Sequence, residues 1–149
     1  MTIPESKKEI VEVLENIIKI VGKMGMRIEE FESGSVKVRL PKEPKVNHIG
    51  TVYAGSLFSL ADFIGGMLFS SCFDTNKYYP ILKEVTIAFK RPATTDVTVA
   101  VSLTDDEITD LKRLADSVGK AEFVKNLELK DENGNVCCIA RGIFQVRKA

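Results

Sequence analysis

The sequence predicts an α+β protein in which a curved antiparallel sheet wraps around one long central helix. Three observations support this prediction. The stretch from Ala54 to about Cys72 is apolar on every side, as expected of a buried helix. Segments on both sides of it alternate apolar and polar residues and predict about six strands. Two amphipathic segments predict further helices, one at the N-terminus and an extra one before the last two strands.

Composition and length restrict the possible functions. We expect residues 1–149 to form a single domain, with residues 1–24 forming a helix that packs on it, because a chain of this length can bury a core of its own. The 21 basic residues balance the 21 acidic ones, so there is no general positive field to hold a nucleic acid. A single histidine and three cysteines without ligand spacing argue against a metal site. The odd number of cysteines and the lack of a signal peptide favour a cytoplasmic protein.

The segment from Glu5 to Lys23 predicts an amphipathic helix. Apolar residues recur at spacings of three and four, with charges of both signs between them; they are Ile10, Val13, Leu14, Ile17, Ile18 and Val21. Pro4 marks the start of this helix, and Gly22 and Gly25 mark its end. Because the polar face mixes both charges, packing on a sheet is favoured over binding to a membrane.

Strands and a second helix fill most of the rest of the chain. The strands are predicted near Met26–Phe31, Ser35–Leu40, Tyr79–Ala88, Asp96–Leu103, Lys120–Lys130 and Asn135–Arg147. The pair Asn133-Gly134 is a strong hairpin signal between the last two strands. The second helix is expected between Thr104, a good N-cap residue, and Gly119, a good stop.

The long apolar segment also approaches the length of about 20 residues that spans a bilayer. Asp62 lies near its middle, where a carboxylate costs about 2.5–3.5 kcal/mol on insertion scales. The strands on either side also need a core to pack against. We therefore expect a buried helix and no membrane span.

Asp62 itself needs an explanation. A carboxylate beside Phe58, Phe63 and Ile64 loses hydration, which raises its pKa and costs stability unless donors satisfy it. Three interpretations are open. The helix could expose this face to solvent, the carboxylate could accept a hydrogen bond from a neighbouring backbone N–H, or it could serve in catalysis or substrate positioning.

The start of the same helix has the features of an anion-binding site. Gly50 and Gly55 bracket it, so the backbone can approach a ligand where the helix presents unpaired N–H groups. Asp62 lies two turns further along, about 10 Å by helical rise, which is too far to act on the same carbonyl within one chain. A two-fold dimer with antiparallel helices would bring one subunit's helix start near the other subunit's carboxylate.

The segment Asn47–Asp62, NHIGTVYAGSLFSLAD, resembles the N-x-x-G-T-x-H-G-G-x-x-x-x-L-x-D signature of hotdog-fold acyl-CoA thioesterases of the phenylacetate-degradation type. The order of strands is similar too, so the resemblance extends roughly from Met26 to Arg147. Two departures stand out: Tyr53-Ala54-Gly55 replaces His-Gly-Gly, and Leu82 stands near the position where some members have Ser or Thr, a role open to Glu84 or Thr86 instead. The sequence is closer to a less characterised branch of hotdog proteins with this helix start and an extra helix before the last strands.

The resemblance implies a hotdog fold, hydrolysis of an acyl-CoA thioester, and a homodimer or homotetramer. It implies that Asp62 acts as general base or nucleophile and that Asn47 orients the attacking water or the substrate across the dimer interface. It further implies that the backbone N–H of Ala54 or Gly55 polarises the thioester oxygen. No metal or redox cofactor is expected, and coenzyme A enters only as part of the substrate.

Four more residues near the helix start are candidate substrate contacts. Tyr53 takes the place of the family's histidine, and His48 is either a base near neutral pKa or a loop residue with a local hydrogen bond. Lys90 and Arg91 either bind the phosphates of coenzyme A or are simply solvated at a strand end.

Two other functions stay open. The first is a non-catalytic hotdog protein that binds acyl-CoA or an acyl chain, with Asp62 as a structural acceptor. The second is a dehydratase acting on acyl thioesters, which is disfavoured because the central helix carries no histidine.

Overall fold

The computed structural model describes residues 3–149. Its elements, in chain order, are η1 (Glu5–Lys7), α1 (Lys8–Asn16), α2 (Lys19–Met24), β1 (Arg27–Glu32), β2 (Ser35–Leu40), α3 (Ala54–Cys72), β3 (Tyr78–Phe89), β4 (Val97–Ser102), α4 (Asp105–Val118), β5 (Lys120–Lys130) and β6 (Val136–Lys148). The α+β prediction is confirmed, and the boundaries of the strands and of the two later helices agree with the expected ones within one or two residues.

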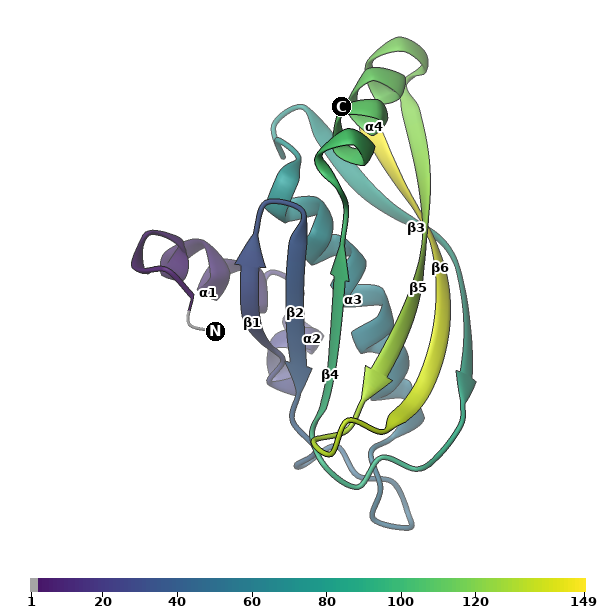
Figure 1. Cartoon of the computed structure of the whole chain (residues 1–149). Helices are drawn as coiled ribbons and strands as arrows, with labels where there is room; N and C mark the ends of the chain where they lie inside the picture. The colour runs from purple at the N-terminus through teal and green to yellow at the C-terminus, as the bar shows by residue number, and fades with distance from the viewer. Residues whose placement is uncertain (1–2) are drawn as a thin grey trace.

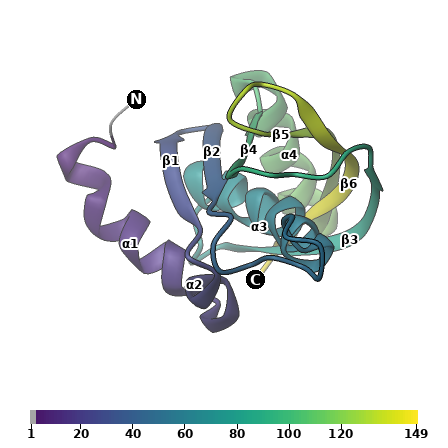
Figure 2. The same cartoon turned by 90° about the horizontal axis from the view of Figure 1, so that it is seen from below.

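The six strands form one antiparallel sheet in the order β1-β2-β4-β5-β6-β3. Seen end-on, this sheet curves around α3, and α1 lies beside β1 (Figures 1 and 2). Helix α2 packs on α1 and α3. Strands β4 and β5 pair only at Thr98 and Lys130 within the described residues. Helix α4 connects these two strands and packs on β5 and β6. This is the hotdog arrangement, so that prediction is confirmed as well.

Helix α3 forms the centre of the core. Its side chains Leu60, Ile64 and Leu68 are fully buried, and the helix packs against strands on both halves of the curved sheet. Within residues 3–149 it is also the one helix long and apolar enough to cross a membrane, but 56% of that apolar window is buried inside the fold. A core helix meets the same criteria, so this composition is weak support for a span.

The N-terminal segment differs from the single helix predicted for Glu5–Lys23. It forms a 3-10 turn and two short helices, with Ile18 in an extended conformation at the break (φ −102°, ψ 111°). The buried apolar side chains are Val11, Leu14 and Val21, whereas four of the six residues of the expected apolar face are exposed: Ile10, Val13, Ile17 and Ile18. Periodicity assigned the wrong buried face because α1 turns Val11 and Leu14 to the core and leaves Ile10 and Val13 exposed, and because the helix is interrupted at Ile18.

Helix α4 begins with the expected cap. The Thr104 hydroxyl accepts a hydrogen bond from the Glu107 N–H at 3.1 Å, and the Glu107 carboxylate accepts one from the Thr104 N–H at 3.1 Å. Gly119 ends the helix in the left-handed region (φ 89°). This reciprocal pair satisfies two N–H groups that a helix start otherwise leaves free.

Candidate functional site

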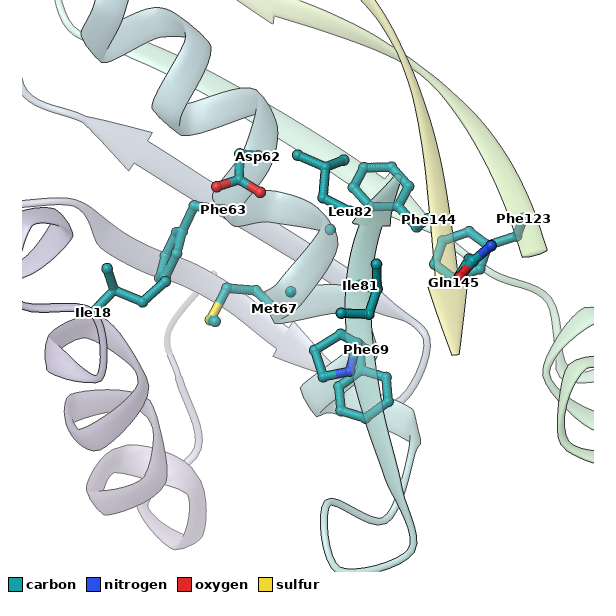
Figure 3. A pocket seen from close by; sticks show the side chains of 13 residues that line it. Ile18, Asp62, Phe63, Met67, Phe69, Ile81, Leu82, Phe123, Phe144 and Gln145 are labelled. Atoms are coloured by element: carbon teal, nitrogen blue, oxygen red, sulfur yellow. The ribbon is translucent and has the colours of Figure 1, made fainter. Parts of the chain in front are cut away.

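Asp62 lies at one side of an apolar cavity between α3 and the β3 edge of the sheet (Figure 3). The cavity has a volume of about 200 Å³. We name it the Asp62 cavity, and its lining residues are Ile18, Asp62, Phe63, Gly65, Gly66, Met67, Phe69, Pro80, Ile81, Leu82, Phe123, Phe144 and Gln145. In Figure 3, the Leu82 side chain lies beside Asp62, so strand β3 presents an apolar group on this side of the carboxylate.

The Asp62 carboxylate is only partly exposed, and burial raises its pKa. Within residues 3–149, its oxygens take part in no hydrogen bond or ion pair. Within the described residues, Asp62 therefore does not accept a hydrogen bond from a neighbouring backbone N–H, as Glu15 does from Ile28 at 2.7 Å. The carboxylate is instead free to interact with a ligand in the cavity.

The ring of Phe144, confined between two glycines and a second aromatic ring, forms one wall of the Asp62 cavity. A Cβ atom on either Gly65 of α3 or Gly142 of β6 would overlap the ring of Phe144. Phe123 of β5 stacks on the same ring, with centroids 5.4 Å apart. The two glycines therefore provide the space in which Phe144 lies, a role that sequence reasoning missed because the four residues come from three separate elements.

Gln145 lines the Asp62 cavity next to Phe144, and the sequence did not identify it as a site residue. Its side chain is 3% exposed, and its amide donates to Glu122 at 2.6 Å and accepts from Nε of Arg147 at 2.9 Å. Glu122 also accepts from Lys83 at 2.7 Å, and these bonds lower its pKa. The polar end of Gln145 is thus held by groups on its own sheet.

The start of α3 presents two free N–H groups. Tyr53 precedes the helix, and its carbonyl accepts from the N–H groups of Ser56 and Leu57. Within residues 3–149, the N–H groups of Ala54 and Gly55 have no such partner. The positive φ values in this part of the chain all belong to glycines, so alanine is compatible with the backbone at position 54.

Tyr53 covers this helix start from outside. A Cβ atom on Gly55 would overlap the Tyr53 ring, so glycine at position 55 leaves room for that ring. The ring is more than half exposed. Tyr53 therefore occupies the outer side of the helix start, where the family signature has histidine.

A second hollow lies at this helix start and collects four of the predicted site residues: Asn47, Ala54, Lys90 and Arg91. Its volume is about 280 Å³. The loop before α3 is tied to the loop after β3 by a hydrogen bond from the Val52 N–H to the Ala93 carbonyl at 2.9 Å. Lys90 and Arg91 are exposed and make no ion pair within residues 3–149. We name this site the helix-start hollow.

Asn47 organises the loop that forms the hollow. Its Oδ1 accepts from the N–H groups of Ile49 at 3.0 Å and Thr51 at 3.1 Å, and its Nδ2 donates to the Thr51 hydroxyl at 2.7 Å. Gly50 completes the turn with φ 81°, a conformation that favours glycine. The second N–H of the Asn47 amide makes no hydrogen bond within residues 3–149.

Replacing Asn47 tests whether this residue does more than hold its loop. N47A removes three hydrogen bonds and should lower the free energy of unfolding by about 1–3 kcal/mol, as judged by chemical denaturation. N47D keeps the acceptor oxygen and should stay close to wild type in stability while it removes the amide donor. If the donor positions water or substrate, N47D loses turnover at near-normal stability; full turnover in N47D contradicts that role.

Of the remaining candidates, Tyr53 and Gly55 lie at the helix start, and His48 lies apart from both sites. His48 is exposed in the loop and lines neither cavity. Within the described part of the chain, no group of histidine, cysteine, aspartate and glutamate side chains is arranged to hold a metal ion. The structure therefore divides the predicted residues between two places, Asp62 in one cavity and Asn47, Ala54, Lys90 and Arg91 in the other.

The curved sheet around α3, with a carboxylate on that helix and free N–H groups at its start, defines a protein of the hotdog superfamily. Within it, the chain belongs to the family described as a domain of unknown function, DUF4442, whose model matches residues 7–145. No curated protein matches the chain. The assignment to the phenylacetate-degradation branch stays a prediction.

Solved structures resemble the whole chain. A Pseudomonas aeruginosa protein described as a protein of unknown function and probable thioesterase is 39% identical, with a TM-score of 0.91 over 100% of this chain and 99% of that one. A mutant thioesterase from the same organism is 23% identical (TM-score 0.73; 93% and 94% covered). A Haemophilus influenzae thioesterase is 17% identical (TM-score 0.72; 99% and 93% covered). The last two show the shared fold alone.

Proposed function

We propose that this protein is an acyl-CoA thioesterase in which Asp62 activates water and the N–H groups at the start of α3 bind the thioester oxygen. The observation that carries the proposal is the half-buried Asp62 carboxylate, which lies beside an apolar cavity and makes no hydrogen bond or ion pair within residues 3–149. The probable-thioesterase description of the 39% identical Pseudomonas aeruginosa protein supports a thioesterase activity in general.

The proposed reaction needs no group beyond those of the chain and water. Asp62 takes a proton from water, whose oxygen forms a bond to the thioester carbonyl carbon. The N–H groups of Ala54 and Gly55 stabilise the negative charge that develops on the carbonyl oxygen. The C–S bond then breaks, and the leaving thiolate receives the proton from Asp62. Burial makes the carboxylate a stronger base, because it raises its pKa.

This mechanism requires two copies of the chain, since Asp62 and the helix start lie about 10 Å apart along α3. We propose a homodimer in which one subunit supplies Asp62 and the other the helix start. Strand β3 offers a suitable surface because it is an edge strand of 12 residues with exposed apolar side chains, among them Tyr79 and Ile81. Whether two dimers associate into a tetramer is a separate question for sedimentation velocity.

Lys90 and Arg91 should bind the phosphates of coenzyme A. The double variant K90E/R91E is expected to raise the KM for acyl-CoA at least about tenfold, because a hydrogen bond to a charged group contributes about 1.5–3 kcal/mol. The KM for an acyl-pantetheine, which lacks the nucleotide phosphates, should stay unchanged. R113E on α4, whose side chain is 72% exposed, is the matched control. An equal effect on both substrates would contradict phosphate binding.

The direct test is a thiol-release assay with purified protein and short, long and aromatic acyl-CoAs. We expect release of coenzyme A from at least one of these classes, at a rate proportional to protein concentration. If no class is hydrolysed, thioesterase activity on acyl-CoA is wrong.

A non-catalytic acyl-CoA-binding protein is the second candidate. It is favoured by the Asn47 amide, which uses its oxygen and one N–H on its own loop, and by the Tyr53 side chain in place of the family's histidine. This function predicts saturable binding of acyl-CoA in calorimetry without release of thiol.

A further inference from the structure

The break between α1 and α2 places an apolar side chain beside the Asp62 cavity. Helix α1 ends at Asn16, Ile18 is extended, and α2 begins with a hydrogen bond from the Gly22 N–H to the Ile18 carbonyl at 3.0 Å. A Cβ atom on Gly22 would lie 2.9 Å from Oδ1 of Asn16. Glycine at this position therefore lets α2 approach the end of α1 closely, which supports the bend.

The bend moves Ile18 to a position that a continuous helix would not give it. Ile18 is seven residues after Val11, so in an unbroken helix both would point to the same side. Val11 is buried against the core, whereas Ile18 is 46% exposed and lines the Asp62 cavity. In Figure 3 its side chain lies beside Phe63, with Met67 next along the cavity wall.

The neighbours of Ile18 do not share this position. Ile17 and Ile20 are 62% and 63% exposed and do not line the cavity. Among the described residues of the N-terminal segment, Ile18 alone lines the Asp62 cavity. Within residues 3–149 the Ile18 side chain is only partly covered from outside, since it is 46% exposed.

We propose that Ile18 is a specificity-determining residue that limits the length of the acyl chain held in the Asp62 cavity. This inference rests on the proposed function for its substrate. A thioester held at Asp62 directs its acyl chain into a space of about 200 Å³, below the roughly 300–1,000 Å³ common for ligand pockets. A short acyl chain fills that space, and a longer one meets the wall to which Ile18 belongs.

Changing the size of this side chain tests the inference. I18A should open the wall and extend the accepted chain by about two or three methylenes, each contributing about a fourfold gain in kcat/KM. I18F should have the opposite effect, with long acyl-CoAs losing at least about tenfold in kcat/KM and the shortest one changing less than about twofold. I17A and I20A are matched controls that should leave the profile over C4 to C16 acyl-CoAs unchanged.

A binding measurement separates this inference from the proposed function. The same variants are titrated with free fatty acids of C4 to C14, with displacement of a fluorescent apolar probe as the readout and melting temperature as the folding control. If wild type releases no thiol, the proposed function fails, while a chain-length shift in binding between I18A and I18F still supports the role of Ile18. Identical chain-length profiles for wild type, I18A and I18F in both assays would overturn it, as would an equal loss for all chain lengths.

Discussion

The substitution D62N is expected to lower acyl-CoA turnover by at least about 100-fold, the usual effect of removing a general base, while leaving the oligomeric state unchanged. Asparagine has nearly the same shape as aspartate but takes up no proton. Because the Asp62 carboxylate makes no hydrogen bond or ion pair within residues 3–149, the substitution breaks no structural contact there. Steady-state thiol release and sedimentation velocity measure the two quantities.

A matched control removes a carboxylate elsewhere. D106N changes an exposed aspartate in the first turn of α4 and should retain wild-type turnover. Unchanged turnover in D62N would show that Asp62 is not the base, and loss of the oligomer would assign it a structural role instead.

The pH dependence gives a second readout of the same residue. Since burial raises the pKa of Asp62, kcat/KM should fall on acidification with an inflection above the ordinary aspartate value of about 3.9. The folded chain then holds this proton more tightly than the unfolded chain, so ionisation of Asp62 lowers the free energy of unfolding as the pH rises through the folded-state pKa. D62N should therefore be more stable than wild type at pH 7, and the difference should vanish below about pH 4.

The second large effect is expected from G65A. Its added methyl group would overlap the Phe144 ring, which is also confined by Gly142 and stacked on Phe123. Overpacking of a core costs about 1–3 kcal/mol, and part of this is offset by the better helix propensity of alanine, up to about 1 kcal/mol. The net result should be a lower free energy of unfolding and, because Phe144 lines the Asp62 cavity, weaker binding of acyl chains.

The adjacent glycine is the control for this substitution. A Cβ atom on Gly66 meets nothing within 4 Å in this chain, so G66A should raise the free energy of unfolding by roughly 0.5–1 kcal/mol through helix propensity alone. Urea denaturation compares the two variants at one protein concentration. If G65A is as stable as G66A, Phe144 is not held in place by the glycine.

The sequence alone predicts most of the secondary structure for a physical reason. The apolar composition of Ala54–Cys72 and the alternation in Ser35–Leu40 and Lys120–Lys130 are local patterns, and local patterns indicate the type of an element directly. Composition did not show that one side of the helix, with Phe58 at 41%, is exposed. The N-terminal helix was the exception, since periodicity assigned Ile17 and Ile18 to one buried face and did not reveal the break between them.

The candidate site was predictable only in part. The signature in Asn47–Asp62 places a carboxylate and a helix start on one helix, and their separation follows from the helical rise. The meeting of Asn47 with Lys90 and Arg91 depends on a contact between two loops about forty residues apart along the chain. Neither the composition nor the local residue pattern predicts that these two loops meet.

A curved sheet around an apolar helix that carries one carboxylate could be inferred from the sequence, because periodicity, capping and the order of elements can be read along the chain. The surroundings of that carboxylate could not. The residues that reach the cavity come from the break before α2, from β5 and from β6: Ile18, Phe123, Phe144 and Gln145. Their meeting depends on strand register and on the break in the N-terminal helices. Such long-range packing has no period in the sequence, so it becomes visible only when the chain is folded.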